Sequence, residues 1–400
     1  MKILIHTDEY YPTPQACAYR MKVLADAFTA AGNDVTVIAS AVNRANGEIG
    51  DHAERIIYAP AARMRKKTTL LRLLNNLSFA VTSLFSALAA GRADVVITTS
   101  PPLLISLSGW IIARCKGAKL VFDVRDIWPD VAMEMGNLRQ DGAACCVFRR
   151  IADFMYRHSD AVTTVSPGKV EKIRAHLRRL HVAAEGKTVL FGNGFDERVL
   201  QCRLDSALME KYAPPGVFFC VYIGNIGLAQ GLDVLLRLAK ETSRPEARFL
   251  LFGDGAQRAE LAEKAAAEGL TNVSFCGVLP HEKVLSVLSA AQLSFIPLKN
   301  ANMRDSIPTK IYEALGIGCP VLLVAEGDAC RVVEEAELGC CVSPDRPERL
   351  AEVFDEMVGQ YARYDEQRRA GARELMKRKY SRQQIAKAYE AWLHDLTGKN

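Results

Sequence analysis

The chain has 400 residues, of which 49% are apolar and 24% are charged, and its formal net charge is +5. No repeat or low-complexity tract interrupts it, so the composition excludes a disordered, a collagen-like or a solenoid protein. The length predicts two domains, each large enough to bury a core of its own.

Short apolar runs alternate with helical patterns in the first half, which is typical of a parallel α/β sheet. The strands that we expect there are Lys2–His6, Asp34–Ala39, Val95–Thr99, Lys119–Asp123, Ala161–Val165 and Thr188–Phe191. The first of them begins near Met1, without the shape of a signal peptide.

Residues 63–90 form a basic and then apolar stretch within this half. The cations Arg63, Arg65, Lys66 and Lys67 precede Leu70, Leu73, Leu74, Leu77, Val81, Leu84 and Leu88, which recur at helical spacing. Residues 1–195 carry 25 Lys and Arg against 17 Asp and Glu, whereas residues 196–400 carry 26 against 29. Two interpretations remain open: a helix lying on an anionic membrane surface, or a helix that faces the core behind a solvated basic lead-in. A membrane span is disfavoured, because the uncharged window 73–91 contains several Asn, Ser and Thr residues.

A second α/β series follows a loop-forming segment at residues 192–196. Its expected strands are Phe218–Ile223, Arg248–Phe252, Val273–Cys276, Leu293–Pro297 and Val321–Val324, with helices such as Gly231–Thr242 and Ala256–Glu268 between them. The domains are therefore expected at 1–195 and 196–379, and a helix over residues 382–396, within 380–400, is expected to return to the first domain. The fold class predicted is α/β with two Rossmann-like domains.

The eleven cysteines are scattered along the chain, in neither C-x-x-C pairs nor a cluster with histidine. They predict no metal site, and we expect reduced, mostly buried thiols in a cytoplasmic protein. We expect no nucleic acid partner.

An acidic residue and a glutamate eight positions later, Asp305 and Glu313, enclose a helix start at Ile307 or Pro308. Proline suits the first helical turn, whose amide groups and positive dipole end can bind an anion. Glu313 lies nearly two turns further on and can accept hydrogen bonds from both hydroxyls of a ribose. The alternative is a solvated helix face with an ion pair between Lys310 and Glu313.

This segment, with the Gly318-Cys319-Pro320-Val321 turn after it, resembles the motif of the retaining glycosyltransferases of family 4. The resemblance covers nearly the whole chain and implies the GT-B fold, with the active site in the cleft between the domains. Residues 122–130, reading FDVRDIWPD, look like the branch that adds N-acetylated amino sugars, often of the N-acetylfucosamine type, to lipid-linked polysaccharide precursors.

The resemblance also implies roles for individual residues. Glu313 would bind the donor ribose, Asp305 the sugar hydroxyls, and Lys310 with the amides of Ile307 to Thr309 the diphosphate. The turn at Gly253 and Asp254 and the residue Val278 are expected near the uracil base. No full dinucleotide fingerprint is present, because Arg258 stands at the third glycine position.

The loop after the first strand of the second domain departs from the family pattern. Asn225 and Gln230 stand where many members have an arginine and a lysine that neutralise the donor phosphates. The charge of the diphosphate must then be met elsewhere, and we favour Lys310 and Arg304. No Asp-x-Asp motif occurs, so a required metal is not expected.

In the first domain, Asp126 follows an expected strand, at the edge where ligands meet an open parallel sheet. Either it caps the following helix, or it orients and helps to deprotonate the acceptor hydroxyl, with Arg125 beside an acceptor phosphate and Trp128 against a sugar or lipid.

The predicted function is retaining transfer of a sugar from a UDP-sugar to a polyprenyl-diphosphate-linked glycan, with no cofactor. The place predicted is the cytoplasmic face of the inner membrane, as a peripheral protein. A non-catalytic scaffold in a glycan assembly complex and a UDP-sugar epimerase are the alternatives.

Overall fold

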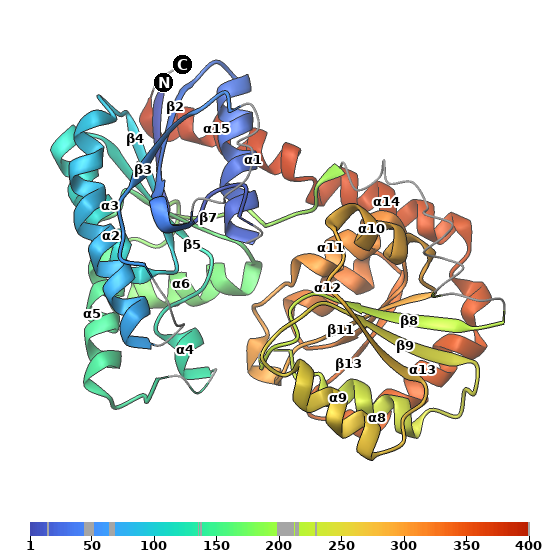
Figure 1. Cartoon of the computed structure of the whole chain (residues 1–400). Helices are drawn as coiled ribbons and strands as arrows, with labels where there is room; N and C mark the ends of the chain where they lie inside the picture. Colours follow the sequence, from blue (N-terminus) through green and yellow to red (C-terminus); the bar gives the residue numbers. More distant parts are fainter. Residues whose placement is uncertain are drawn as a thin grey trace. The chain divides into compact units, whose positions relative to one another are not determined.

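The computed structural model describes residues 1–13, 16–43, 52–63, 69–134, 136, 138–197, 212, 216–228 and 230–398. The chain folds into two units, Met1–Asn193 with Arg382–Asn400, and Gly194–Ser381 (Figure 1). The boundaries differ by two residues from those expected, because Phe195 belongs to the second unit. Its amide donates to the carbonyl of Tyr380 at 2.9 Å, and its ring packs against Gly316.

The first unit contains a seven-stranded parallel sheet in the order β3-β2-β1-β4-β5-β6-β7. Its strands are β1 (Lys2–His6), β2 (Asp34–Ser40), β3 (Arg55–Ala59), β4 (Val95–Ser100), β5 (Lys119–Val124), β6 (Ala161–Thr164) and β7 (Thr188–Leu190). Six of these were expected. The edge strand β3 was missed, because only its last residue is fully buried.

Helices cover both faces of this sheet (Figure 1). They are α1 (Ala16–Ala30), α2 (Thr69–Ala89), α3 (Leu103–Lys116), α4 (Asp130–Glu134), α5 (Ala143–His158), α6 (Pro167–Arg179) and α15 (Arg382–Thr397), with the short helix η1 (Ala41–Asn43). The helices α1 and α15 pack on one face, and α2, α3, α5 and α6 pack on the other.

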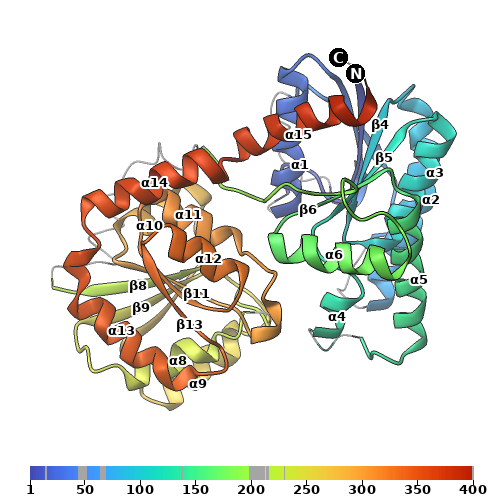
Figure 2. The ribbon, with the colours of Figure 1, turned by 180° about the vertical axis from the view of Figure 1, so that it is seen from behind.

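The C-terminal helix α15 lies beside α1 (Figure 2). Asn33, just after α1, donates to Glu390 of α15 at 2.8 Å, and the rings of Phe191 and Tyr389 stack at 4.3 Å. This helix therefore completes the core of the first unit, although it follows the second unit in the chain.

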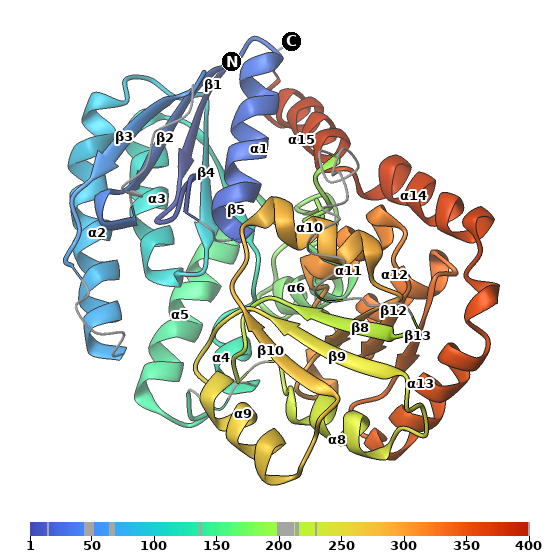
Figure 3. The same cartoon turned by 45° about the vertical axis from the view of Figure 1, so that its right-hand side comes forward.

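The second unit contains a six-stranded parallel sheet in the order β10-β9-β8-β11-β12-β13 (Figure 3). Its strands are β8 (Phe218–Ile223), β9 (Ala247–Phe252), β10 (Val273–Gly277), β11 (Leu293–Pro297), β12 (Val321–Val324) and β13 (Gly339–Val342). The four-residue edge strand β13 was missed, because its sequence, GCCV, has no apolar run long enough to predict a strand.

Helices also cover both faces of the second sheet. On one side are α8 (Asp233–Glu241), α9 (Arg258–Ala267) and α13 (Leu350–Gly359); on the other are α10 (His281–Ala290), α11 (Thr309–Ile317), α12 (Asp328–Glu335) and α14 (Glu366–Tyr380). Short helices η3 (Ala301–Met303), η4 (Pro347–Arg349) and η5 (Tyr361–Arg363) lie in the connections. The prediction of two Rossmann-like α/β units is confirmed.

The helix α2 exposes most of its large apolar side chains and buries polar ones. Its large exposed apolar side chains are Leu70, Leu73, Leu74, Leu77, Val81, Phe85 and Leu88, with Leu88 80% and Phe85 68% exposed. Its polar side chains bond to the protein: Asn75 donates to the carbonyl of Ala62 at 2.7 Å, and Ser83 pairs with His6 at 3.0 Å. The core-facing interpretation of the leucine pattern is therefore wrong. Residues 70–89 are long and apolar enough to cross a membrane by length and composition alone.

The ten cysteines that the structure describes are all free thiols, but the expectation that most are buried is wrong. Four are buried, namely Cys17, Cys145, Cys220 and Cys319, and the others are half-buried or exposed. Several expected features lie outside the described residues: Arg65, Lys66, Lys67 and Cys202.

Candidate active site

The strand order of the second sheet reverses between β8 and β11. Successive strands run outward from β8 to β10 and, in the other direction, from β11 to β13. In open α/β sheets, ligands bind beyond the carboxyl ends of the strands at such a reversal. The segments that follow β8 and β11 therefore frame the candidate donor site, and both contain predicted residues.

The loop after β8 is tied to the loop after β9 by backbone hydrogen bonds. The amide of Gly224 donates to Phe252 at 2.8 Å, and the amide of Ile226 donates to Asp254 at 2.9 Å. Gly253 has a φ of 143°, and a Cβ there would lie 1.9 Å from the carbonyl oxygen of Gly224. Glycine is required at position 253 because the two loops touch through their backbones.

The loop residues that we expect to contact the uracil base or the diphosphate are accessible to solvent. Asp254 and Val278 are exposed, the latter by 72%, just after β9 and β10. Asn225 is exposed and Gln230 half-buried, and both side chains lie beside Gly227. The structure thus places these four residues in loops at one edge of the sheet, and their contacts with a ligand remain predictions.

The helix α11 follows β11 and begins at Thr309, with Pro308 as its N-cap. The expected start at Ile307 or Pro308 is one or two residues too early, because Pro308 has an extended ψ of 133°. The first amide groups of an α-helix have no acceptor within the helix, so those of Thr309 and Lys310 are placed to bind an anion. Gly318, in the left-handed conformation with φ 89°, ends the helix.

Lys310 reaches from α11 to the end of β8. Its Nζ donates to the hydroxyl of Tyr222 at 2.9 Å and lies 4.1 Å from the centre of that ring. A Cβ at Gly224 would lie 2.6 Å from Nζ. Burial lowers the pKa of Lys310 to about 8, and the nearby Glu313 opposes this effect. The alternative of a solvated helix face is therefore wrong for Lys310, because its side chain packs against the end of β8.

The two acidic residues of the motif differ in exposure. Glu313 is half-buried, and Asp305, in the segment between η3 and α11, is only 7% exposed. Ile307 and Thr309 are half-buried. Asp305 and Ile307 lie just before α11, and Thr309 and Glu313 lie in α11 together with Lys310.

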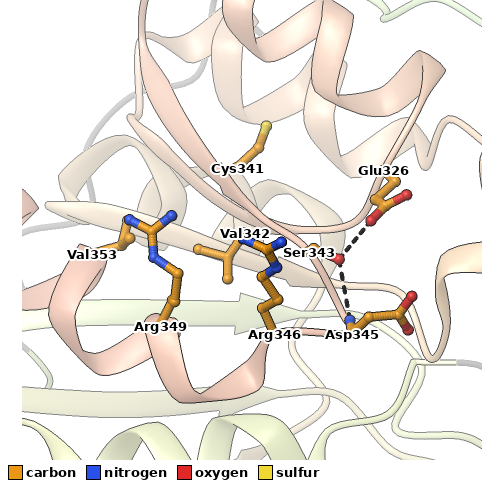
Figure 4. Close-up of a pocket in the computed structure, with 8 residues that line it drawn as sticks. All are labelled: Glu326, Cys341, Val342, Ser343, Asp345, Arg346, Arg349 and Val353. Carbon is orange, nitrogen blue, oxygen red and sulfur yellow. Dashed lines mark hydrogen bonds between the residues drawn. The ribbon is translucent and has the colours of Figure 1, made fainter.

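Arg304 was expected to bind the diphosphate, but its side chain forms an ion pair within the protein. Its side chain is 67% exposed and pairs with Glu326, whose other oxygen accepts a hydrogen bond from Ser343 at 2.5 Å. Glu326 and Ser343 line a pocket of about 450 Å³ beyond β12 and β13, together with Cys341, Val342, Asp345, Arg346, Arg349 and Val353 (Figure 4). Its lining includes none of the predicted donor residues, so Lys310 is the better placed of the two cations for the diphosphate.

The strand order of the first sheet reverses between β1 and β4, which marks a second ligand edge. Asp8 and Glu9 follow β1, and Arg125, which follows β5, donates to Thr99 at 2.9 Å and to the carbonyl of Pro101. Burial and, to a smaller extent, the charge of Glu9 raise the pKa of Asp8 to about 7, although Arg125 opposes the shift.

Asp126 lies one strand away from this reversal. Its carboxylate is 43% exposed and is 4.0 Å from Nζ of the buried Lys169. Trp128, half-buried, packs edge-on against Phe148 of α5 at 5.4 Å. The roles predicted for Asp126, Arg125 and Trp128 remain predictions.

Replacing Asp8 with asparagine is expected to stabilise the protein at pH 8. The folded-state pKa of about 7 exceeds the ordinary aspartate value of 3.8, so the folded protein keeps a proton that the unfolded chain releases between these values. Stability therefore falls as the pH rises through this window, by on the order of 2–4 kcal/mol, and the asparagine variant avoids the fall. Thermal unfolding at pH 5 and pH 8 measures this loss of stability in the wild-type and Asp8→Asn proteins. Asp34→Asn, at an exposed carboxylate, is the control. Equal pH dependence in the wild-type and Asp8→Asn proteins would contradict the account.

Sequence reasoning missed two residues of these sites. Tyr222 is the fifth residue of a buried strand, and no local pattern distinguishes it from a core residue. Asp8 lies two residues after β1, where no local pattern marks it as a site residue. Among the described residues, no group of three His, Cys, Asp or Glu side chains is arranged to hold a metal ion.

The two units match two family models. The model described as "Glycosyl transferase 4-like domain" matches residues 16–194, and that described as "Glycosyl transferases group 1" matches residues 207–374. The chain belongs to the glycosyltransferases, with family-4-like domains in the two-domain GT-B arrangement, and it is an enzyme of the hexosyltransferase kind.

Individual relatives agree with this class. WcaI of Escherichia coli, by name a colanic acid biosynthesis glycosyl transferase, is 24% identical over 88% of this chain and 90% of its own. WbjE of Pseudomonas aeruginosa, by name a glycosyltransferase, is 24% identical over 67% of each chain. The crystal structure of Anabaena HepE with UDP covers 99% of this chain and 100% of its own at 17% identity, with a TM-score of 0.73, which supports the fold.

Proposed function

We propose that this glycosyltransferase moves a sugar from a UDP-sugar to a hydroxyl of a lipid-linked saccharide, with retention at the anomeric carbon, during assembly of a bacterial surface glycan. The observation that carries the proposal is the meeting of the α11 N-terminus, Lys310 and Glu313 at the β8/β11 reversal. Supporting it are the UDP complex of HepE and the colanic acid role in the name of WcaI.

Each part of the donor has a partner in this proposal. Glu313 accepts hydrogen bonds from the ribose hydroxyls, Val278 and the Gly253 turn contact the uracil, and Asp305 contacts the sugar. Lys310 and the first amides of α11 meet the diphosphate, and Asn225 and Gln230 donate hydrogen bonds to it. The resemblance of residues 122–130 favours an N-acetylhexosamine as the sugar.

The chemistry needs charge stabilisation more than a nucleophile. Departure of UDP leaves an oxocarbenium-like sugar, and a donor phosphate oxygen takes the proton of the acceptor hydroxyl on the same face. Lys310 stabilises the negative charge that develops on the diphosphate, and Asp126 orients the acceptor.

The exposed apolar face of α2 supports a peripheral place on the cytoplasmic side of the inner membrane. This helix contains no acidic residue, and its single cation, Arg72, is exposed, as are Arg63 and Arg92 on either side of it. An apolar face with basic flanks matches an anionic lipid surface, where a lipid-linked acceptor would reside. Because Phe79 and Ser83 of the same helix are buried in the protein, we propose that α2 lies on the bilayer.

Vesicle flotation tests this placement. The wild-type protein is expected to bind phosphatidylglycerol-containing vesicles, and the triple variant Leu74→Gln, Phe85→Gln and Leu88→Gln is expected to bind at least roughly tenfold more weakly, because apolar area no longer enters the lipid. Leu190→Gln, at a side chain 42% exposed at the end of β7, is the control. Equal binding by the triple variant would overturn the role of α2.

Nucleotide binding tests the donor assignment. Calorimetry with UDP, GDP, ADP and CDP at pH 7 is expected to give the tightest binding for UDP, and its loss in Lys310→Met. A preference for another nucleotide would overturn the UDP assignment. Tight UDP binding without turnover on any acceptor would favour the scaffold, which the neutral Asn225 and Gln230 also suit.

A further inference from the structure

The ammonium group of Lys310 is held by the end of strand β8 and not by its own helix. It lies over the Tyr222 ring, 4.1 Å from its centre, and donates to the Tyr222 hydroxyl at 2.9 Å. Tyr222 is fully buried. Its hydroxyl therefore has a fixed place, and an ammonium group bound to it has little freedom to move.

The Tyr222 hydroxyl also connects the lysine to the β8 loop. While it accepts from Lys310, it donates to the backbone carbonyl of Asn225. One phenol thus bridges the cation to the loop that carries the neutral amides Asn225 and Gln230.

Space for the lysine is provided by Gly224. A Cβ at this position would lie 2.5 Å from Cε and 2.6 Å from Nζ of Lys310, and the φ of 135° is unfavourable for any other residue. Tyr222 and Gly224, at the end of β8, together form a binding site for one ammonium group.

Within the part of the chain that the structure describes, few other charges act on Lys310. Glu313, on its own helix, favours the charged form. On the elements packed against α11, Arg369 and Arg373 of α14 donate to Gly318 and Ile317 at the far end of the helix, and the charge of Asp328 of α12 acts on Tyr312. The hydroxyl of Tyr222 is the hydrogen-bond acceptor that the structure gives to Lys310.

We propose that Tyr222 is a positioning residue, which holds the Lys310 ammonium group against the donor diphosphate. Lys310 then supplies the positive charge that the neutral Asn225 and Gln230 of the β8 loop do not. This role rests on the proposed function. It also couples donor binding to pH, because the diphosphate binds the charged form of Lys310, which is lost above the lysine's pKa of about 8.

UDP affinity measured by calorimetry between pH 7 and pH 9.5 tests the role. For the wild-type protein the affinity is expected to fall up to tenfold per pH unit above pH 8. Tyr222→Phe keeps the ring and removes the acceptor, so its affinity should be roughly tenfold lower at pH 8 and its decline should begin at lower pH. Lys310→Met should bind weakly with no such decline, and Tyr312→Phe, a buried tyrosine on α11, should behave like the wild type.

A second measurement follows Lys310 without any nucleotide. In protein labelled with ¹³Cε-lysine, the Lys310 signal is assigned by its loss in Lys310→Met and titrated by NMR. Its pKa is expected to be lower in Tyr222→Phe, because the charged form has lost an acceptor.

The outcomes separate this inference from the function on which it rests. If Lys310→Met loses UDP affinity while Tyr222→Phe keeps both the affinity and the lysine titration, the positioning role is overturned and the donor site stands. If Tyr222→Phe weakens UDP equally at every pH with an unmoved titration, Tyr222 only supports the loop, and the role is again overturned. Absence of UDP binding by the wild-type protein would overturn the proposed donor and the role together.

Discussion

Replacing Lys310 with methionine is expected to lower kcat/KM for the donor by roughly 10²- to 10³-fold, with little change in thermal stability. Methionine preserves the length of the side chain but cannot stabilise the negative charge of the departing diphosphate. The charge of Lys310 matters because Asn225 and Gln230, in the β8 loop, are neutral.

The pH profile distinguishes loss of charge from loss of packing. With the pKa of Lys310 near 8, kcat/KM of the wild-type enzyme should decline above that pH, whereas the profile of Lys310→Met should lack this limb. Lys240→Met, at a surface lysine paired with Glu268, is the matched control and should keep the wild-type profile. An alkaline limb that persists in Lys310→Met would show that another group titrates.

The second large effect is expected at Glu313. Glu313→Gln should weaken UDP binding at pH 7 by roughly 10- to 100-fold, because hydrogen bonds to a charged carboxylate contribute about 1.5–3 kcal/mol. Loss of this charge would also lower the pKa of Lys310, since Glu313 favours the lysine's charged form, so affinity alone does not isolate the ribose contact.

Comparison of UDP with 2′-deoxy-UDP isolates it. The wild-type protein should prefer UDP clearly, and Glu313→Gln should lose most of that preference, whatever happens to Lys310. Glu334→Gln, at an exposed glutamate of α12, should keep it. An unchanged ratio in Glu313→Gln would show that the ribose is bound elsewhere.

Most strands could be predicted because central parallel strands are continuous apolar runs. The edge strands β3 and β13 were missed because one is half-buried and the other has four residues. The helix α2 was found from its periodicity, but its orientation was not. A leucine stripe predicts an apolar face without saying whether the core or the outside receives it, and here Asn75 and Ser83 face inward.

The candidate donor site could be predicted in part for a similar reason. Residues 304–313 are contiguous, so their proximity follows from the chain itself. The pairing of Lys310 with Tyr222 joins residues 88 positions apart, and only the order of β8 and β11 in the sheet brings them together. Likewise, the sequence predicts that Arg304 binds phosphate, whereas in the structure its side chain pairs with Glu326.

Acceptor-dependent release of UDP is the most direct test of the proposed transferase activity. Purified enzyme would receive a panel of UDP- and GDP-sugars, with and without a polyprenyl-diphosphate-linked monosaccharide, in the presence of EDTA. One UDP-sugar is expected to yield UDP only when acceptor is present, and Glu313→Ala is expected to abolish the release. Failure of every donor and acceptor pair, despite tight binding of UDP, would contradict the transferase and favour the non-catalytic scaffold.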